Sequence, residues 1–141
     1  MRTFDTGATR DNDQGKLDFE GFFSPLVLEE YAEYMNKHRK QSDGQLRDSD
    51  NWQKGIPLTV YMKSLWRHFF DLWKEHRGIP TQEGRIEALM GCLFNVMGYA
   101  HQYLIEKERE GFNREEYIED IMSIPGSTVG NLEERSEDDG L

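Results

Sequence analysis

The sequence predicts an all-α fold, a bundle of three main helices followed by a short C-terminal helix. Three segments repeat apolar residues at the spacing of an amphipathic helix: one that starts at Ser24-Pro25, a second over Leu58–His76 and a third over Glu83–Leu104. No segment alternates apolar and polar residues as a half-buried strand does. We therefore expect the three helices to bury their apolar faces against one another.

The ends of these segments carry helix start and stop signals. Ser24 can accept the free backbone donors of a first turn, and Pro25 suits the first helical position. Gly44 ends the first helical segment at the latest, and Gly78 with Pro80 ends the second. The first two helices therefore have boundaries that the sequence alone predicts.

The two ends of the chain are predicted to be less regular. Residues 1–23 are rich in turn formers and charges and predict an irregular arm. Asn113 and Glu116 resemble the N-terminal cap of a short fourth helix. The acidic residues that follow have little to bury, so we expect one domain over 1–122 and a disordered tail over 123–141.

Composition narrows the class of protein. The 141 residues include a single cysteine, Cys92, which excludes a disulfide framework and favours a reducing compartment. No signal peptide is recognisable at the start, and no run of 18 apolar residues occurs. These features are typical of a soluble cytoplasmic protein with no membrane partner.

The net charge of -10 is concentrated in the C-terminal part of the chain. Residues 106–141 hold 12 acidic and 4 basic residues, whereas residues 1–105 hold 15 and 13. No basic face is available to displace the counterions of a duplex. Duplex nucleic acid is therefore not an expected partner.

The third helix carries polar residues where a buried helix needs an explanation for them. One narrow stripe consists of glycines, a carboxylate and amides: Gly84, Glu87, Gly91, Asn95, Gly98 and Gln102. Glycine costs about 1 kcal/mol relative to alanine in a helix interior, so either another helix or a ligand is expected to lie close to the stripe. Glu87 and Asn95 should be largely buried, and a buried carboxylate needs a cation, a donor or a metal.

Further candidate residues lie on the other two helices and on the N-terminal arm. In the first helix, Glu29 and Glu33 border the apolar stripe, whereas Glu30 points away from it. The polar face of the second helix and the arm supply the remaining candidates: Lys63, Ser64, Arg67, His68, Asp71, Arg10 and Lys16. Arg10 and Lys16 could lie over an anion such as a phosphate. A solvated acidic face, ordinary amphipathicity and a frayed terminus are the alternative interpretations of these three groups.

The order of several short motifs resembles a known family. The chain shows, in sequence, Gly7 with Arg10-Asp11, Gly15-Lys16-x-Asp18, Asn51-Trp52-x-x-Gly55, Tyr61-x-x-Ser64-x-x-Arg67-His68 and Phe94-Asn95. This pattern, spanning residues 7–104, resembles the N-terminal domain family of phage-encoded dATP/dGTP diphosphohydrolases. The resemblance implies an all-α, MazG-like nucleotide pyrophosphohydrolase that acts in the cytoplasm of the host.

The resemblance also implies a metal site built from carboxylates. MazG-like enzymes hold Mg²⁺, or Mn²⁺ in its place, with a Glu-Glu-x-x-Glu motif that Glu29, Glu30 and Glu33 match. Their second motif, Glu-x-x-Asp, is matched by Glu87, but Met90 stands where the aspartate belongs. Asp71 or Asn95 could complete the metal shell instead. The family pattern favours Glu30 and Glu33 as ligands, whereas the helical wheel favours Glu29 and Glu33. Glu33 is therefore the ligand that both arguments share.

The implied reaction cleaves a purine deoxynucleoside triphosphate such as dATP or dGTP into the monophosphate and pyrophosphate. Glu29, Glu30, Glu33 and Glu87 would hold the metal, and Asp71 or the spare glutamate of the first helix would act as general base. Phosphate contacts are expected from Arg10, Lys16, Lys63 and Arg67, with His68 beside them. Asn95 could contact the nucleotide, and the glycines next to it would let that ligand approach the backbone.

Two other functions remain open on the sequence. The chain could be a helical phage protein that binds a host protein, with the polar stripe packing helices closely in a homodimer. It could also be a nucleotide-binding module without turnover, since Met90 replaces an expected ligand. In each case the number of aromatic residues on the second and third helices favours a homo-oligomer.

Overall fold

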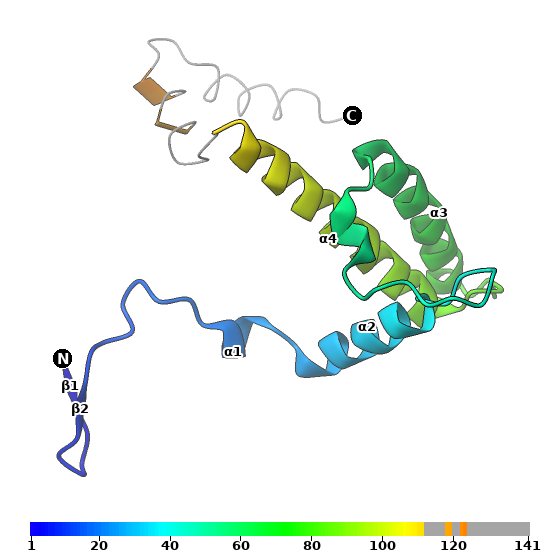
Figure 1. Cartoon of the computed structure of the whole chain (residues 1–141). Helices are drawn as coiled ribbons and strands as arrows, with labels where there is room; N and C mark the ends of the chain where they lie inside the picture. The colour runs from blue at the N-terminus through cyan, green and yellow to red at the C-terminus, as the bar shows by residue number, and fades with distance from the viewer. Residues whose placement is uncertain (112–117, 120–121, 124–141) are drawn as a thin grey trace, which may run out of the picture. The chain divides into compact units, whose positions relative to one another are not determined.

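The computed structural model describes residues 1–111, 118–119 and 122–123, and these are mainly helical (Figure 1). The predicted all-α class is confirmed, and the three main helices are present. The predicted C-terminal helix and the acidic tail lie largely outside the described residues. No helix in the described part of the chain is long and apolar enough to cross a bilayer.

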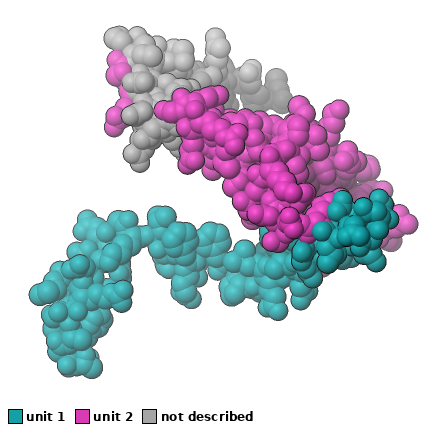
Figure 2. All heavy atoms as spheres, viewed as in Figure 1, with its two compact units in different colours: residues 1–46 teal, residues 47–141 magenta. Residues whose placement is uncertain are grey.

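The chain divides into two units, Met1–Leu46 and Arg47–Leu141, and each is described by itself (Figure 2). The first unit contains a small hairpin and two helices, and the second contains a 3₁₀ turn and two long helices. The single domain expected over 1–122 stays a prediction.

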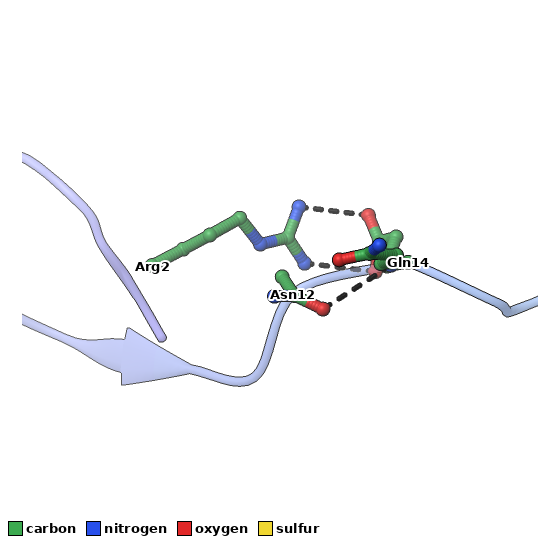
Figure 3. Close-up of polar contacts among 4 residues, drawn as sticks. Arg2, Asn12 and Gln14 are labelled. Atoms are coloured by element: carbon green, nitrogen blue, oxygen red, sulfur yellow. Dashed lines mark hydrogen bonds and ion pairs between the residues drawn. The ribbon is translucent and has the colours of Figure 1, made fainter.

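The first unit begins with a two-stranded hairpin that the sequence did not reveal. Strand β1 (Arg2–Thr3) pairs antiparallel with β2 (Thr9–Arg10), and the turn between them closes at Gly7, where φ is 82°. An ion pair then holds the next loop to the hairpin, because the two terminal guanidinium nitrogens of Arg2, Nη1 and Nη2, donate to Asp13 at 2.8 and 3.0 Å (Figure 3). The prediction of a wholly irregular arm is therefore wrong here, because two-residue strands are too short to show alternation.

Two helices complete the first unit. Helix α1 (Phe19–Phe22) is one turn, capped by the Asp18 carboxylate, which accepts from the Gly21 backbone at 2.9 Å. Helix α2 (Pro25–Lys37) starts as predicted, with the Ser24 hydroxyl accepting from the Val27 backbone at 3.3 Å.

The second unit is built on an antiparallel pair of helices. The 3₁₀ turn η1 (Asn51–Lys54) precedes α3 (Leu58–His76), whose bounds match the prediction, and α4 (Arg85–Arg109) packs along α3 (Figure 1). The start of α4, two residues later than predicted, follows from Gly84, whose φ of 82° lies outside the helical region. Trp52 anchors η1 on α4, because its ring meets the His101 ring edge-on at 4.8 Å between centroids.

Two glycines of α4 set how closely the helices approach. A Cβ atom on Gly98 would lie 2.3 Å from the ring of Tyr61, and one on Gly91 would lie 2.5 Å from the ring of His68. Tyr61 is only 2% exposed, so its ring fills the space that Gly98 leaves. The two contacts are seven residues apart on each helix, which gives the pair a continuous antiparallel register.

The interior of the described residues is small. Its buried apolar side chains are Tyr34, Tyr61, Ala88 and Met90, whereas most large aromatic residues of α3 are exposed. The apolar stripe predicted for α3 is therefore present, but among the described residues only part of it is buried.

Candidate functional site

The glycine stripe of α4 accommodates a neighbouring helix. Of the two explanations that the sequence left open, close helix packing holds at Gly91 and Gly98, whose free space is taken by His68 and Tyr61 of α3. The expectation that these two glycines admit a ligand to the backbone is therefore wrong.

A cluster of three titratable side chains occupies the end of the helix pair near Gly91. His68 Nδ1 lies 2.6 Å from Oε1 of Glu83, within hydrogen-bond distance. A side-chain hydrogen bond also joins Glu83 to Asp71. Both His68 and Glu83 are half-buried, with 24% and 20% of their side-chain surface exposed. A hydrogen bond between two carboxyl groups needs a proton on one of them, and the pKa of Glu83 is raised in the direction that favours its protonated form.

The environment of the cluster favours this protonated form. Burial raises the pKa of Glu83, and the hydrogen bond and negative charge of Asp71 raise it further, whereas His68 acts in the opposite direction. Burial and the Glu83 charge also raise the pKa of the Cys92 thiol. The Cys92 thiol is therefore a poor nucleophile.

The replacement Glu83→Gln is expected to remove a pH dependence of stability. Because the pKa of Glu83 is raised in the folded protein, the wild type should lose free energy of unfolding as pH rises from the ordinary glutamate pKa to the raised value. Glutamine does not titrate, so this loss should disappear. Urea unfolding at a series of pH values and one protein concentration measures the difference.

Glu75→Gln is the matched control for this measurement. The pKa of Glu75 is lowered, mainly by its hydrogen bonds from Thr81, so its contribution is lost as pH falls rather than as pH rises. The control should therefore keep the loss of stability at rising pH. An unchanged pH profile in Glu83→Gln would contradict the assignment.

The loop between α3 and α4 fixes the position of Glu83. The Glu75 carboxylate accepts from the backbone and hydroxyl of Thr81, each at 2.7 Å, and the Thr81 hydroxyl accepts from the Gly84 backbone at 3.0 Å. Arg85 donates to the Glu75 carbonyl oxygen at 2.8 Å. This network holds the chain on both sides of Glu83 and directs its side chain to His68.

Asn95 is buried as predicted, at 2% exposure, but its amide is used within its own helix. Its Nδ2 donates to the Gly91 carbonyl oxygen at 2.7 Å. This bond satisfies one donor of the amide without a ligand. Contact between Asn95 and a nucleotide stays a prediction.

Glu87 and Met90 occupy different environments on α4. Glu87 is half-buried and Met90 is buried, at 7% exposure. Met90 therefore contributes to the small apolar core, and an aspartate there would bring an unpaired charge into it. This explains the departure from the Glu-x-x-Asp pattern without assigning Met90 a role in the chemistry.

The carboxylates of α2 are all accessible. Glu29, Glu30 and Glu33 are exposed, so the expected difference between Glu30 and the other two is not visible in their exposure. The buried residue of α2 is Tyr34, one position after Glu33. The three carboxylates lie within two turns of α2 and are all accessible to an ion from solvent.

The predicted phosphate contacts are on the surface. Arg10 ends β2, directly across the hairpin from Arg2, and Lys16 follows in the next loop. Lys63 and Arg67 are exposed on α3, and Arg67 precedes His68 directly. These cations are therefore accessible to a large anion.

Glu83 is the site residue that sequence reasoning missed. His68 and Asp71 lie on the polar face of α3, and both of them interact with Glu83. A signal was present, because Glu83 lies next to Gly84 and one helical turn before Glu87. The pairing of Glu83 with His68 depends on the register of α3 against α4. Residue spacing within a single helix does not predict that register.

The donor atoms are of the kind that Mg²⁺ prefers, since carboxylate oxygens are the usual protein ligands of this ion. The described residues contain no group of three or more His, Cys, Asp or Glu side chains gathered to hold a metal. Each of Glu29, Glu30, Glu33 and Glu87 carries the type of ligand that the ion takes, and their joint role as a metal site stays a prediction.

Comparisons with protein-family models, curated proteins and solved structures found no match to this chain.

Proposed function

We propose that this protein is a Mg²⁺-dependent nucleoside triphosphate diphosphohydrolase. Its substrates would be purine deoxynucleotides such as dATP and dGTP, and its products the monophosphate and pyrophosphate. The order of its sequence motifs, which resembles that of the phage dATP/dGTP diphosphohydrolase family, supports the substrate class. The observation that carries the proposal is the cluster of Asp71, Glu83 and His68, in which His68 Nδ1 lies 2.6 Å from Glu83 and burial raises the pKa of the Glu83 carboxyl.

The cluster can perform the proton transfer that the reaction needs. Attack of water on the α-phosphate releases one proton and forms a P–O bond as the bond to pyrophosphate breaks. Because Glu83 is the carboxyl group with the raised pKa, Asp71 is the carboxylate left to accept that proton. His68, hydrogen-bonded to Glu83, keeps the pair in position.

Cations on α3 would orient the triphosphate beside this cluster. Arg67 lies one turn before Asp71, and Lys63 lies one turn before Arg67, so their side chains emerge along one edge of the helix. Guanidinium and ammonium groups both bind phosphate oxygens. Arg10 and Lys16 are the further phosphate contacts in this proposal, and Asn95 and His68 are the remaining residues predicted to contact the nucleotide.

The metal would be held by the carboxylates that the family pattern implies, Glu29, Glu30, Glu33 and Glu87. A bound Mg²⁺ supplies charge neutralisation at the phosphate oxygens and lowers the pKa of a coordinated water. Glu33 is a proposed ligand both on the helical wheel and in the family pattern, and Glu87 is a half-buried carboxylate of α4.

The proposal is tested by incubating the full chain with each of the four dNTPs and Mg²⁺ and measuring pyrophosphate and orthophosphate separately. Release of pyrophosphate with dATP and dGTP, abolished by EDTA, is the expected result. Orthophosphate as the first product would contradict the assigned bond. If neither product forms but equilibrium dialysis shows that a nucleotide binds, the protein is a nucleotide-binding module without turnover. If neither product forms and no nucleotide binds, the alternative of a protein that binds a host protein is favoured.

A further inference from the structure

We propose that one face of α3 binds single-stranded nucleic acid. This face carries four exposed aromatic side chains, those of Trp66, Phe69, Phe70 and Trp73. Four cations lie beside these rings on the same helix or at its end: Lys63, Arg67, Lys74 and Arg77. We call the rings and cations together the aromatic–cation stripe. The inference does not rest on the proposed catalysis.

The aromatic–cation stripe lies outside the contact between α3 and α4. Tyr61 and His68 mark the side of α3 that meets α4, because their rings occupy the space at Gly98 and Gly91. At about 100° per residue, every ring and cation of the stripe lies at least about 80° around the helix from that contact. The packing of the two helices therefore leaves the stripe accessible to a ligand.

Both carboxylates of α3 are directed elsewhere, so the stripe contains cations only. Asp71 is hydrogen-bonded to Glu83, and Glu75 accepts from the backbone and hydroxyl of Thr81 at 2.7 Å. Among the described residues, no carboxylate forms an ion pair with any of the four cations. A count of charges along the sequence does not show this separation, because it arises from the helical arrangement. The charge of the stripe is therefore complementary to an anion.

Two of the cations are positioned directly against rings of the stripe. The Lys74 ammonium lies 5.2 Å from the centroid of the Phe70 ring, and the Arg77 guanidinium lies 5.5 Å from that of Trp73. The rings of Phe70 and Trp73 also contact each other, at 6.2 Å between centroids. This arrangement offers contacts to phosphates next to the aromatic surfaces on which bases stack.

The length of the stripe suits a short strand. The rings from Trp66 to Trp73 cover about 10 Å along the helix, and the cations from Lys63 to Arg77 cover about 21 Å. Domains that bind single strands contact about four nucleotides at the lower end of their site sizes, which is the number that this length accommodates. Trp66 is the most exposed of the four rings, at 66%, and is the expected main platform for a base.

The chemistry of the stripe favours a single strand over three other partners. In a duplex the faces of the bases are covered by neighbouring base pairs, so the rings would have nothing to stack on. A second copy that met this face across a two-fold axis would bring the four cations against one another. An acidic protein segment could pair with the cations, but it would not match the rings as bases do, since every base has a flat aromatic face.

Binding is measured by titrating the full chain into fluorescently labelled oligo-dT and oligo-rU of about 12 nucleotides and following the anisotropy. Both probes are used because base stacking and phosphate contacts are common to DNA and RNA, and binding of either strand supports the proposal. The affinity should fall as salt rises, with a slope of about -3 in a double-logarithmic plot if four cations neutralise phosphates. A labelled duplex of the same length should bind at least about 10-fold more weakly.

Variants separate the contribution of the rings from that of the cations. Trp66→Ala should weaken binding about 10-fold, whereas Trp66→Phe keeps a ring and should retain most of the affinity. Lys74→Gln should reduce the size of the salt slope by about 0.7. Lys54→Gln is the matched control, because Lys54 is an exposed lysine of η1 outside the stripe, and it should change neither affinity nor slope. Circular dichroism confirms that each variant keeps its helices.

Several results would overturn the proposal. They are the absence of binding of either strand at low salt, an unchanged affinity in Trp66→Ala, and a duplex bound as tightly as the single strand. Polyglutamate bound as tightly as oligo-dT would assign the stripe to an acidic protein segment instead. If acrylamide quenches the tryptophan emission of the free wild type no more strongly than that of Trp66→Phe, the ring is covered in the free protein, as in self-association through this face.

Discussion

Gly98→Ala is expected to lower the free energy of unfolding by about 2 kcal/mol. The new methyl group would lie 2.3 Å from the ring of Tyr61, which is 2% exposed and has no space to move into. Overpacking of this kind costs about 1–3 kcal/mol or more, and the better helix propensity of alanine offsets only about 1 kcal/mol. Urea unfolding at a fixed protein concentration measures the change, since association also contributes to stability.

A double-mutant cycle separates the clash from other effects of the substitution. Tyr61→Ala alone should cost about 3–5 kcal/mol because it empties a buried aromatic position. In the double variant the methyl group no longer meets a ring, so the combined loss should be smaller than the sum of the two single losses. Strict additivity would show that Gly98 is needed for a reason other than the approach of α3.

Glu87→Gln is expected to reduce Mg²⁺-dependent pyrophosphate release at least about 100-fold if Glu87 is a metal ligand as proposed. Glutamine keeps the size of the side chain at this half-buried position and removes the charge that attracts the ion. The fold should persist, which circular dichroism and urea unfolding can show. Steady-state assays over a range of Mg²⁺ concentrations provide the measurement.

The control for Glu87→Gln is a surface carboxylate on the same helix. Glu108→Gln changes the charge by the same amount at an exposed position near the end of α4 and should leave turnover unaffected. Glu33→Gln should behave like Glu87→Gln, because both are proposed ligands. A fully active Glu87→Gln protein would remove Glu87 from the metal site.

The helices were predictable because their signals are local. The bounds of α3 follow from its apolar period and from Gly78 and Pro80, and the start of α2 follows from Ser24 and Pro25. The hairpin was not predicted, since each strand has two residues and its information lies in the turn at Gly7. Periodicity thus predicts long elements and gives no information on very short ones.

The candidate site was predictable only in part, because it depends on contacts between helices. The burial of Asn95 followed from its apolar neighbours, and His68 and Asp71 were recognised from one helical face. The place of Glu83 between them was not, because it is set by the register of α3 against α4. The two glycines were correctly identified as positions of close approach, but the sequence did not show which side chains would fill them.

That register has a consequence for how the helices are aligned along their axes. If α4 slid by one turn, about 5.4 Å, the Tyr61 ring would face Asn95 or Gln102 instead of a glycine, and His68 would lose its place at Gly91 in the same movement. The observed alignment gives both rings the space they need, and a shift of one turn in either direction does not. The approach of His68 to Glu83 therefore depends on two residues that have no side chain, and a change at either should disturb this contact as well as the packing of the helices.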